Sequence, residues 1–108
     1  MTLQNQTILV TGATGAIGQA ICASLAVEGA RVVIHYGRNR AAAQALLEAI
    51  GGKGTCLSAD LSDPSAATAL FDAAVTAEGK ITGLVNNAGI RTEMPVTADL
   101  TDWQATWD

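Results

Sequence analysis

Residues 8–18 read Ile-Leu-Val-Thr-Gly-Ala-Thr-Gly-Ala-Ile-Gly, and this stretch decides the fold of the chain. Its first three residues are apolar and predict the end of a buried strand. Glycines at positions 12, 15 and 18 follow at intervals of three. A strand that turns through glycines into a helix is therefore expected here. The apolar residues that continue at helical spacing are Ile17, Ile21 and Leu25.

Each glycine of this turn has a physical role in binding a dinucleotide. Gly12 allows a tight turn after the strand, and Gly15 lets the backbone approach a diphosphate. Gly18 lets the helix lie close to the sheet, while the N–H groups and the dipole at the start of the helix attract the anion. Glycines can also serve close packing alone, so the interpretation depends on support from later segments.

The composition describes one modest α/β domain and excludes several functions. Of the 108 residues, 49% are hydrophobic and 15% are charged. The net charge is −4 and no basic cluster is longer than residues 38–40, which argues against a nucleic-acid partner. No apolar run reaches the about 18 residues that span a membrane, and the polar N-terminus lacks the apolar core of a signal peptide. We expect a cytoplasmic protein without a membrane partner.

The two cysteines, Cys22 and Cys56, lie in a predicted helix and a predicted strand. Nothing pairs them at the spacing of metal ligands, so we predict neither a metal site nor a disulfide. Buried free thiols in a reducing compartment are the expected state.

Four strand-then-helix units follow one another with short connections. The predicted strands cover residues 7–11, 31–36, 55–59 and 81–85. The predicted helices cover residues 17–28, 40–50, 63–78 and a segment from about residue 100. The third helix begins with Asp63 as its cap, Pro64 in its first turn, and Gly79 at its end. The residues expected on its buried face are Leu70, Phe71, Ala74 and Val75.

This alternation predicts a Rossmann-like α/β fold, a doubly wound parallel sheet with helices on both faces. Right-handed crossovers give the strand order 3-2-1-4, so the fourth strand lies beside the first where the order reverses. Ligands bind at that point, beyond the carboxyl ends of the strands. We therefore expect the turn at Gly12 and the loop at Asn87 to meet, although about seventy residues separate them.

Three motifs together resemble the short-chain dehydrogenase/reductase family. They are Thr11-Gly12 with Gly18, the pair Asp60-Leu61 after the third strand, and Asn86-Asn87-Ala88-Gly89 after the fourth. The resemblance extends from Thr7 to Asp108, and the last tetrapeptide is its most specific part. It implies an enzyme that uses NAD or NADP to move hydride between a carbonyl and an alcohol, acting on a small-molecule carbonyl substrate.

The resemblance also implies roles for individual positions. Residues 12–17 would line the cofactor diphosphate and ribose. Asp60 would bond the adenine amino group, with Leu61 against the ring, and residues 87–89 would border the ribose on the nicotinamide side. Each has an ordinary alternative, because Asp60 can accept backbone N–H groups in a turn and Asn87 can satisfy the ends of buried strands.

The glycine spacing departs from the common branch of the family. Ala16 stands at the middle glycine position, and Gly15 stands where a basic residue often occurs. The spacing Thr-Gly-x-x-Gly-x-x-Gly is more usual in the extended branch, which includes nucleotide-sugar epimerases and dehydratases. The Asn-Asn-Ala-Gly segment favours the common branch.

The end of the second strand bears on the choice of cofactor. NAD recognition needs an acidic side chain there, but the position is Tyr36. Arg38 and Arg40 follow and offer guanidinium groups to a 2′-phosphate, so we predict NADP over NAD. The alternative is that both arginines are solvated residues at a helix start. The complete set of expected cofactor-binding residues is Gly12, Thr14, Gly15, Ala16, Ile17, Gly18, Tyr36, Arg38, Asp60, Leu61, Asn87, Ala88 and Gly89.

No catalytic residue is predicted within this sequence. The family uses Tyr-x-x-x-Lys with a Ser and an Asn, whereas the one tyrosine here, Tyr36, is followed four residues later by Arg40. We therefore interpret residues 1–108 as the incomplete NADP-binding half of an oxidoreductase, truncated before a fifth strand, inactive alone and a homo-oligomer when complete. The alternatives are a non-catalytic nucleotide-binding module and an extended-branch nucleotide-sugar epimerase or dehydratase.

Overall fold

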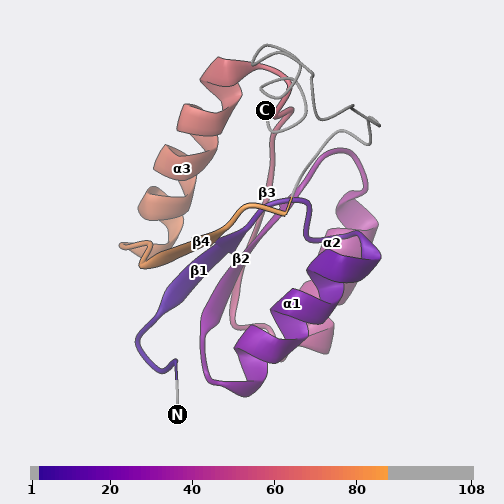
Figure 1. The fold of residues 1–108 in the computed structure, drawn as a ribbon, viewed down its shortest axis with the longest axis vertical. Coiled ribbons are helices and arrows are strands. Elements are labelled where there is room, and N and C mark those ends of the chain that lie inside the picture. Colours follow the sequence, from indigo (N-terminus) through magenta and orange to yellow (C-terminus); the bar gives the residue numbers. More distant parts are fainter. Residues whose placement is uncertain (1–2, 88–108) are drawn as a thin grey trace, which may run out of the picture.

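Four short parallel strands form the centre of the structure, a computed structural model that describes residues 3–87 (Figure 1). Strands and helices alternate as the sequence predicts, and the helix expected from about residue 100 lies outside the described residues. The elements are β1 (Thr7–Val10), α1 (Ala16–Val27), β2 (Arg31–Tyr36), α2 (Arg40–Ala49), β3 (Gly54–Ser58), α3 (Pro64–Glu78) and β4 (Gly83–Val85).

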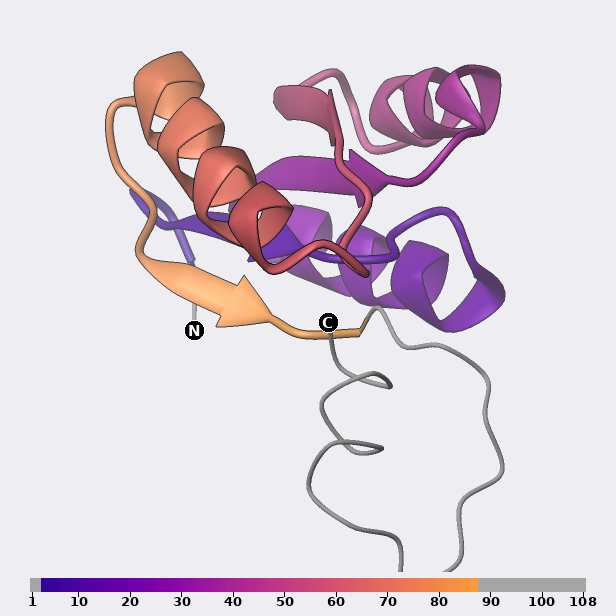
Figure 2. The same ribbon diagram turned by 90° about the horizontal axis from the view of Figure 1, so that it is seen from above.

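The sheet has the order β3-β2-β1-β4, and every neighbouring pair is parallel. The predicted order 3-2-1-4 is therefore confirmed. Helices α1 and α2 cover one face and α3 covers the other (Figure 2). This is the Rossmann-like, doubly wound arrangement, in which the order reverses between β1 and β4.

Alternating side chains along β1 and β2 supply two separate cores. Val10 and Ile34 lie fully buried on the side of α1 and α2, together with Cys22 and Ala43 from those helices. Leu9 and Val33 point to the opposite side, where they pack against Leu70 and Ala74 of α3. Burial on both faces explains why the central strands are apolar at nearly every position.

The ends of α3 follow the predicted capping chemistry, and α2 begins with a cap of the same kind. Asp63 caps α3, since its carboxylate accepts a 3.0 Å hydrogen bond from the N–H of Ser65. Pro64 follows in the first turn, and Gly79 closes the helix with a φ of +83°. Asn39 caps α2 in the same way, accepting from the N–H of Ala42 at 3.0 Å.

One expectation about a buried helix face is wrong. Phe71 is 45% exposed, because α3 turns the stripe of Leu70 and Ala74 toward the sheet and rotates Phe71 away from it. On α1 the buried residues are Gly18 and Cys22, while Ile17 at its start is 69% exposed. The small residues on that stripe bring α1 close to the sheet, and the larger apolar residues stay at its margin.

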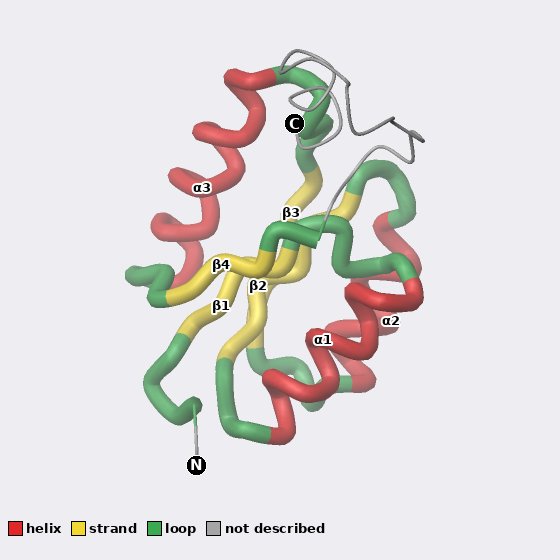
Figure 3. The backbone as a smooth tube through the Cα atoms, in the orientation of Figure 1, coloured by secondary structure: helices red, strands yellow, loops and turns green. Residues whose placement is uncertain are grey.

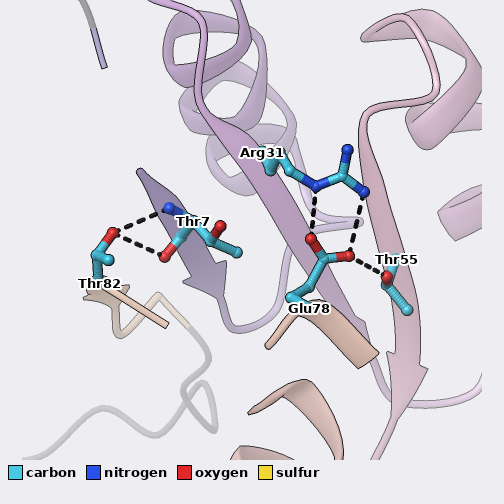
Figure 4. A network of polar contacts seen from close by, with 5 residues as sticks. All are labelled: Thr7, Arg31, Thr55, Glu78 and Thr82. Atoms are coloured by element: carbon cyan, nitrogen blue, oxygen red, sulfur yellow. Dashed lines mark hydrogen bonds and ion pairs between the residues drawn. The ribbon is translucent and has the colours of Figure 1, made fainter. Parts of the chain in front are cut away.

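Polar side chains connect the amino ends of the strands (Figure 4). The carboxylate of Glu78, at the end of α3, accepts from Arg31 Nε at 2.6 Å and from Thr55 Oγ1 at 2.5 Å. Next to β4, the Thr82 hydroxyl accepts from the Thr7 N–H at 2.9 Å and donates to the Thr7 carbonyl at 3.2 Å. These bonds join α3, β2 and β3 at one point, and β1 to the start of β4 at another.

Candidate functional site

The glycine-rich turn lies between β1 and α1, at the carboxyl end of the sheet (Figure 3). Gly12 has a φ of +61°, which a residue with a Cβ rarely adopts, so the predicted need for glycine in this turn is confirmed. A Cβ on Gly18 would lie 2.5 Å from the Gly12 carbonyl oxygen and 2.7 Å from the Cα of Ala13. The close approach predicted for Gly18 is therefore made to the turn itself.

Gly15 differs from the other two glycines of the motif. It precedes α1 with a φ of −73°, which any residue adopts. A Cβ there would meet only the Gly12 oxygen, at an ordinary contact distance of 3.8 Å. The described protein atoms therefore leave space on the outer side of Gly15, and internal packing does not require a glycine at this position.

The loop after β4 meets the turn after β1, as the topology predicts. Asn87 Nδ2 donates to the Gly12 carbonyl at 3.1 Å, and the Asn87 N–H donates to Thr11 Oγ1 at 3.0 Å. The Thr11 hydroxyl also lies 3.2 Å from Oδ1 of Asn86. Asn87 thus satisfies the end of the neighbouring strand while fixing the turn, and the next two residues of the motif, Ala88 and Gly89, lie outside the described residues.

His35 is a member of this site that the sequence analysis missed. Its side chain is 4% exposed at the carboxyl end of β2. The Gly12 N–H donates to His35 Nδ1 at 2.9 Å, and His35 Nε2 lies 2.9 Å from the carbonyl of Ala59. Since a carbonyl only accepts, Nε2 carries the proton and the ring is neutral. The signal for it was a single histidine within a strand that is otherwise apolar between Val32 and Tyr36.

The start of α1 faces away from the protein with its backbone donors uncapped. Gly15 precedes the helix without a side-chain cap bond, and the first turn contains no acidic residue. Gly15, Ala16 and Ile17 are all exposed, and Thr14 is half-buried. The N–H groups of this turn and the positive end of the helix dipole therefore face the surface beside Gly12.

The ends of β2 and β3 form the neighbouring part of the same edge. Tyr36 is buried in the core beside α2, while Arg38 is exposed in the loop that follows β2. The exposed carboxylate of Asp60 accepts from the Ser62 N–H at 3.1 Å and from the Ser62 hydroxyl at 2.6 Å. These bonds, with a smaller contribution from Arg38, lower the pKa of Asp60. Leu61 is half-buried against the core under α3.

The sequence alternative for Asp60 is thus observed, since the carboxylate does accept a backbone N–H within a turn. Arg38 and Asp60 follow the carboxyl ends of β2 and β3, which are neighbouring parallel strands, so both exposed residues lie at the same edge of the sheet. Asn87 and Gly18 both contact Gly12, and Gly15 lies in the same turn. Arg38 and Asp60 lie further along this edge of the sheet, after the carboxyl ends of β2 and β3.

Other chemistry is limited in the part of the chain that the structure describes. Cys22 is buried and its pKa is raised to about 11 by that burial, while Cys56 is half-buried; both are free thiols. Within residues 3–87, no three His, Cys, Asp or Glu side chains gather to hold a metal ion. Among the helices described, none has the length and apolar character to cross a bilayer.

A parallel sheet in this order, with a glycine-rich turn at its reversal point, defines a Rossmann-like nucleotide-binding architecture. Residues 6–108 match the sequence profile described as short chain dehydrogenase. An uncharacterized oxidoreductase of Methylorubrum extorquens is 43% identical over 91 residues, which cover 82% of this chain and 37% of that protein. The chain belongs to the short-chain dehydrogenase/reductase family.

Solved structures agree with this assignment. A short chain dehydrogenase from Burkholderia cenocepacia in complex with NADP is 36% identical, with a TM-score of 0.81 over 98% of this chain and 45% of that one. A blue fluorescent protein from a metagenomic library, in complex with NADPH, is 29% identical with a TM-score of 0.82 and the same coverage. The chain therefore spans less than half the length of these relatives.

Proposed function

We propose that residues 1–108 are the NADP-binding part of an oxidoreductase that transfers hydride between a nicotinamide cofactor and a carbonyl or alcohol substrate. The substrate would be a small molecule, and the complete enzyme would be a homo-oligomer. The observation that carries the proposal is the Gly12 turn, which neighbouring elements hold from several sides beside an uncapped, exposed helix start.

The residues of the turn fit a diphosphate. The backbone N–H groups of this turn are polarised by the dipole of α1 and need an acceptor, which the oxygens of an anion would provide. The space beside Gly15 lets such a group approach the backbone, because no side chain of the described protein fills it. Asn87 and His35 hold the Gly12 peptide in place before any ligand arrives, which reduces the ordering that binding requires.

The choice of NADP rests on the loop after β2. The position that carries a carboxylate in NAD-binding relatives is Tyr36, whose ring is buried and offers no negative charge. Arg38 is exposed nearby and can bind a 2′-phosphate with two hydrogen bonds. Two similar solved structures are complexes with NADP or NADPH, which supports the same choice.

When bound, the nicotinamide would supply the hydride. The residues of this chain would bind and orient it: the turn at residues 12–18 would hold the diphosphate, and Arg38 and Asp60 would contact the adenosine end. Asn87 would fix the neighbouring loop, with Ala88 and Gly89 beside the ribose. The Tyr-x-x-x-Lys pair that would move the proton is absent from this sequence, so we propose binding without turnover for these residues alone.

Titration of the chain with NADPH and NADH, followed by nicotinamide fluorescence, tests this proposal. We expect NADPH to bind more tightly, and R38E to weaken NADPH by about tenfold or more while changing NADH by less than about twofold. K53E is the matched control, since it reverses an exposed charge at the opposite end of the sheet. Equal losses for both cofactors in R38E would contradict the NADP assignment, and no binding of either would contradict the function.

A further inference from the structure

His35 lies between two segments that the proposed function assigns to different parts of the cofactor. Its Nδ1 accepts from the Gly12 N–H in the diphosphate turn, and its Nε2 donates to the carbonyl of Ala59. Ala59 immediately precedes Asp60 at the adenosine end. One buried ring therefore spans from the turn after β1 to the loop after β3, two segments separated by more than forty residues of sequence.

The two hydrogen bonds of the His35 ring fit one of its protonation states. In the neutral ring with the proton on Nε2, both nitrogens are satisfied at 2.9 Å. In the protonated ring, Nδ1 also carries a hydrogen, which points at the Gly12 N–H, so two donors face each other and the bond is lost. The Gly12 peptide then keeps only its bonds on the carbonyl side, including that from Asn87.

The surroundings of His35 favour the neutral ring. Burial lowers its pKa, opposed in part by the bond to Ala59. At the carboxyl end of the sheet, where His35 lies, the loops after its own strand and after β3 carry the exposed charged residues Arg38 and Asp60. The turn after β1 and the loop after β4 present uncharged Thr11 and Asn87.

We propose that His35 is a positioning residue that holds the Gly12 turn ready for the cofactor diphosphate and couples it to the adenosine segment, and that it does so only while its ring is neutral. The inference rests on the proposed function. If His35 acts in this way, its protonation weakens cofactor binding. By linkage, cofactor binding lowers the pKa of His35 to the same extent.

The chain contains one histidine, so its ring nitrogens give unambiguous NMR signals after labelling with nitrogen-15. We expect the Nε2–H tautomer at about pH 7.5, and a titration midpoint below the ordinary value of 6.5. Saturation with NADP⁺ should move the midpoint lower still. A ring protonated on Nδ1, or a midpoint that NADP⁺ leaves unchanged, would overturn the inference.

Calorimetric titration with NADP⁺ supplies the reciprocal measurement. Its affinity should fall between about pH 7.5 and about pH 5.5 in the wild type, in part because the 2′-phosphate also titrates near pH 6. H35N separates the two effects, because Asn Oδ1 keeps an acceptor near the Nδ1 position but does not titrate. We expect H35N to bind within about threefold of wild type at the higher pH and to lose about twofold to fivefold less affinity on acidification, because a midpoint below 6.5 limits the wild-type loss to less than about tenfold.

H35L, which removes both bonds, should bind about tenfold more weakly than the wild type at the higher pH, with its fold checked by circular dichroism. The difference should be smaller at the lower pH, where the wild type has itself lost the bond from Gly12. An equal loss on acidification in wild type and H35N would overturn the inference while leaving the proposed function intact. If the wild type gives no heat of binding with NADP⁺ at either pH, the proposed function fails and the inference fails with it.

Discussion

The two ends of the parallel sheet use polar groups in different ways. At the amino end, Glu78 is matched by Arg31 and Thr55, and its side chain is 3% exposed. At the carboxyl end, His35 and Asn87 satisfy the Gly12 peptide, but the start of α1 beside it stays exposed without a cap. At the first end the Glu78 carboxylate is paired within the fold, whereas at the second the backbone donors of α1 are exposed, and we propose that an anion binds there.

This difference separates stability from binding. Changes at the amino end should lower the free energy of unfolding and leave cofactor affinity unchanged in the folded protein. Changes on the ligand side of the carboxyl end should lower cofactor affinity and leave the free energy of unfolding nearly unchanged. Gly18 should affect both stability and binding, because α1 packs there against the backbone of the glycine-rich turn.

The largest effect is expected for G18A. Its Cβ would lie 2.5 Å from the Gly12 oxygen and 2.7 Å from the Ala13 Cα, and both are backbone atoms that cannot rotate away. We expect a loss of about 1–3 kcal/mol in the free energy of unfolding, measured with urea, together with loss of NADPH binding. An unchanged free energy of unfolding in this variant would show that the turn and α1 are less closely packed than these distances indicate.

G15A sharpens the comparison because it adds the same methyl group three residues earlier. The backbone at Gly15 accepts any residue, and the added Cβ meets only one atom at 3.8 Å. The free energy of unfolding should therefore change by less than about 0.5 kcal/mol. NADPH should bind about tenfold more weakly, because the methyl group occupies the approach to the diphosphate. Unchanged affinity would argue that no ligand sits against this turn.

A smaller effect is expected at the amino end from E78Q. The side-chain bond from Arg31 is the main reason that the pKa of Glu78 lies below its ordinary value of 4.5. A lowered carboxyl pKa stabilises the fold above pH 4.5, and this contribution is lost as the pH falls through the folded value. At pH 7, E78Q should cost about 1 kcal/mol and leave NADPH affinity unchanged.

Urea unfolding of wild type and E78Q at neutral pH and below pH 4.5 measures this contribution. The wild type should lose more stability on acidification than the variant does, so the two curves should converge. Q44E, which adds an exposed carboxylate on α2, on the face of the sheet opposite α3 and Glu78, controls for the acidic condition itself. An equal loss of unfolding free energy in wild type and E78Q on acidification would show that the Arg31–Glu78 ion pair does not contribute to stability.

The sequence was sufficient for the topology and for the meeting of Gly12 with Asn87. Both follow from the order of the elements and the handedness of the crossovers, which local patterns determine. The caps at Asp63 and Gly79 were also predictable, because each depends on a bond within a few residues.

Contacts between side chains of different elements were not predictable in the same way. His35 and Glu78 find their partners only through strand register and helix placement, which no local pattern specifies. Phe71 was misplaced because both it and Leu70 fit a helical stripe, and the sheet beneath α3 selects between them. Asp60 shows a further limit, since its turn bonds and its expected role toward adenine use the same carboxylate.

The central claim is that a diphosphate binds at the turn between β1 and α1. Backbone amide shifts measured by NMR during titration with NADP⁺ test it most directly. The account predicts that the largest changes fall on residues 12–18 and Asn87, with Thr7, Thr55 and Thr82 at the amino end unchanged. Changes centred on those threonines, or none in the glycine-rich turn at saturation, would contradict it.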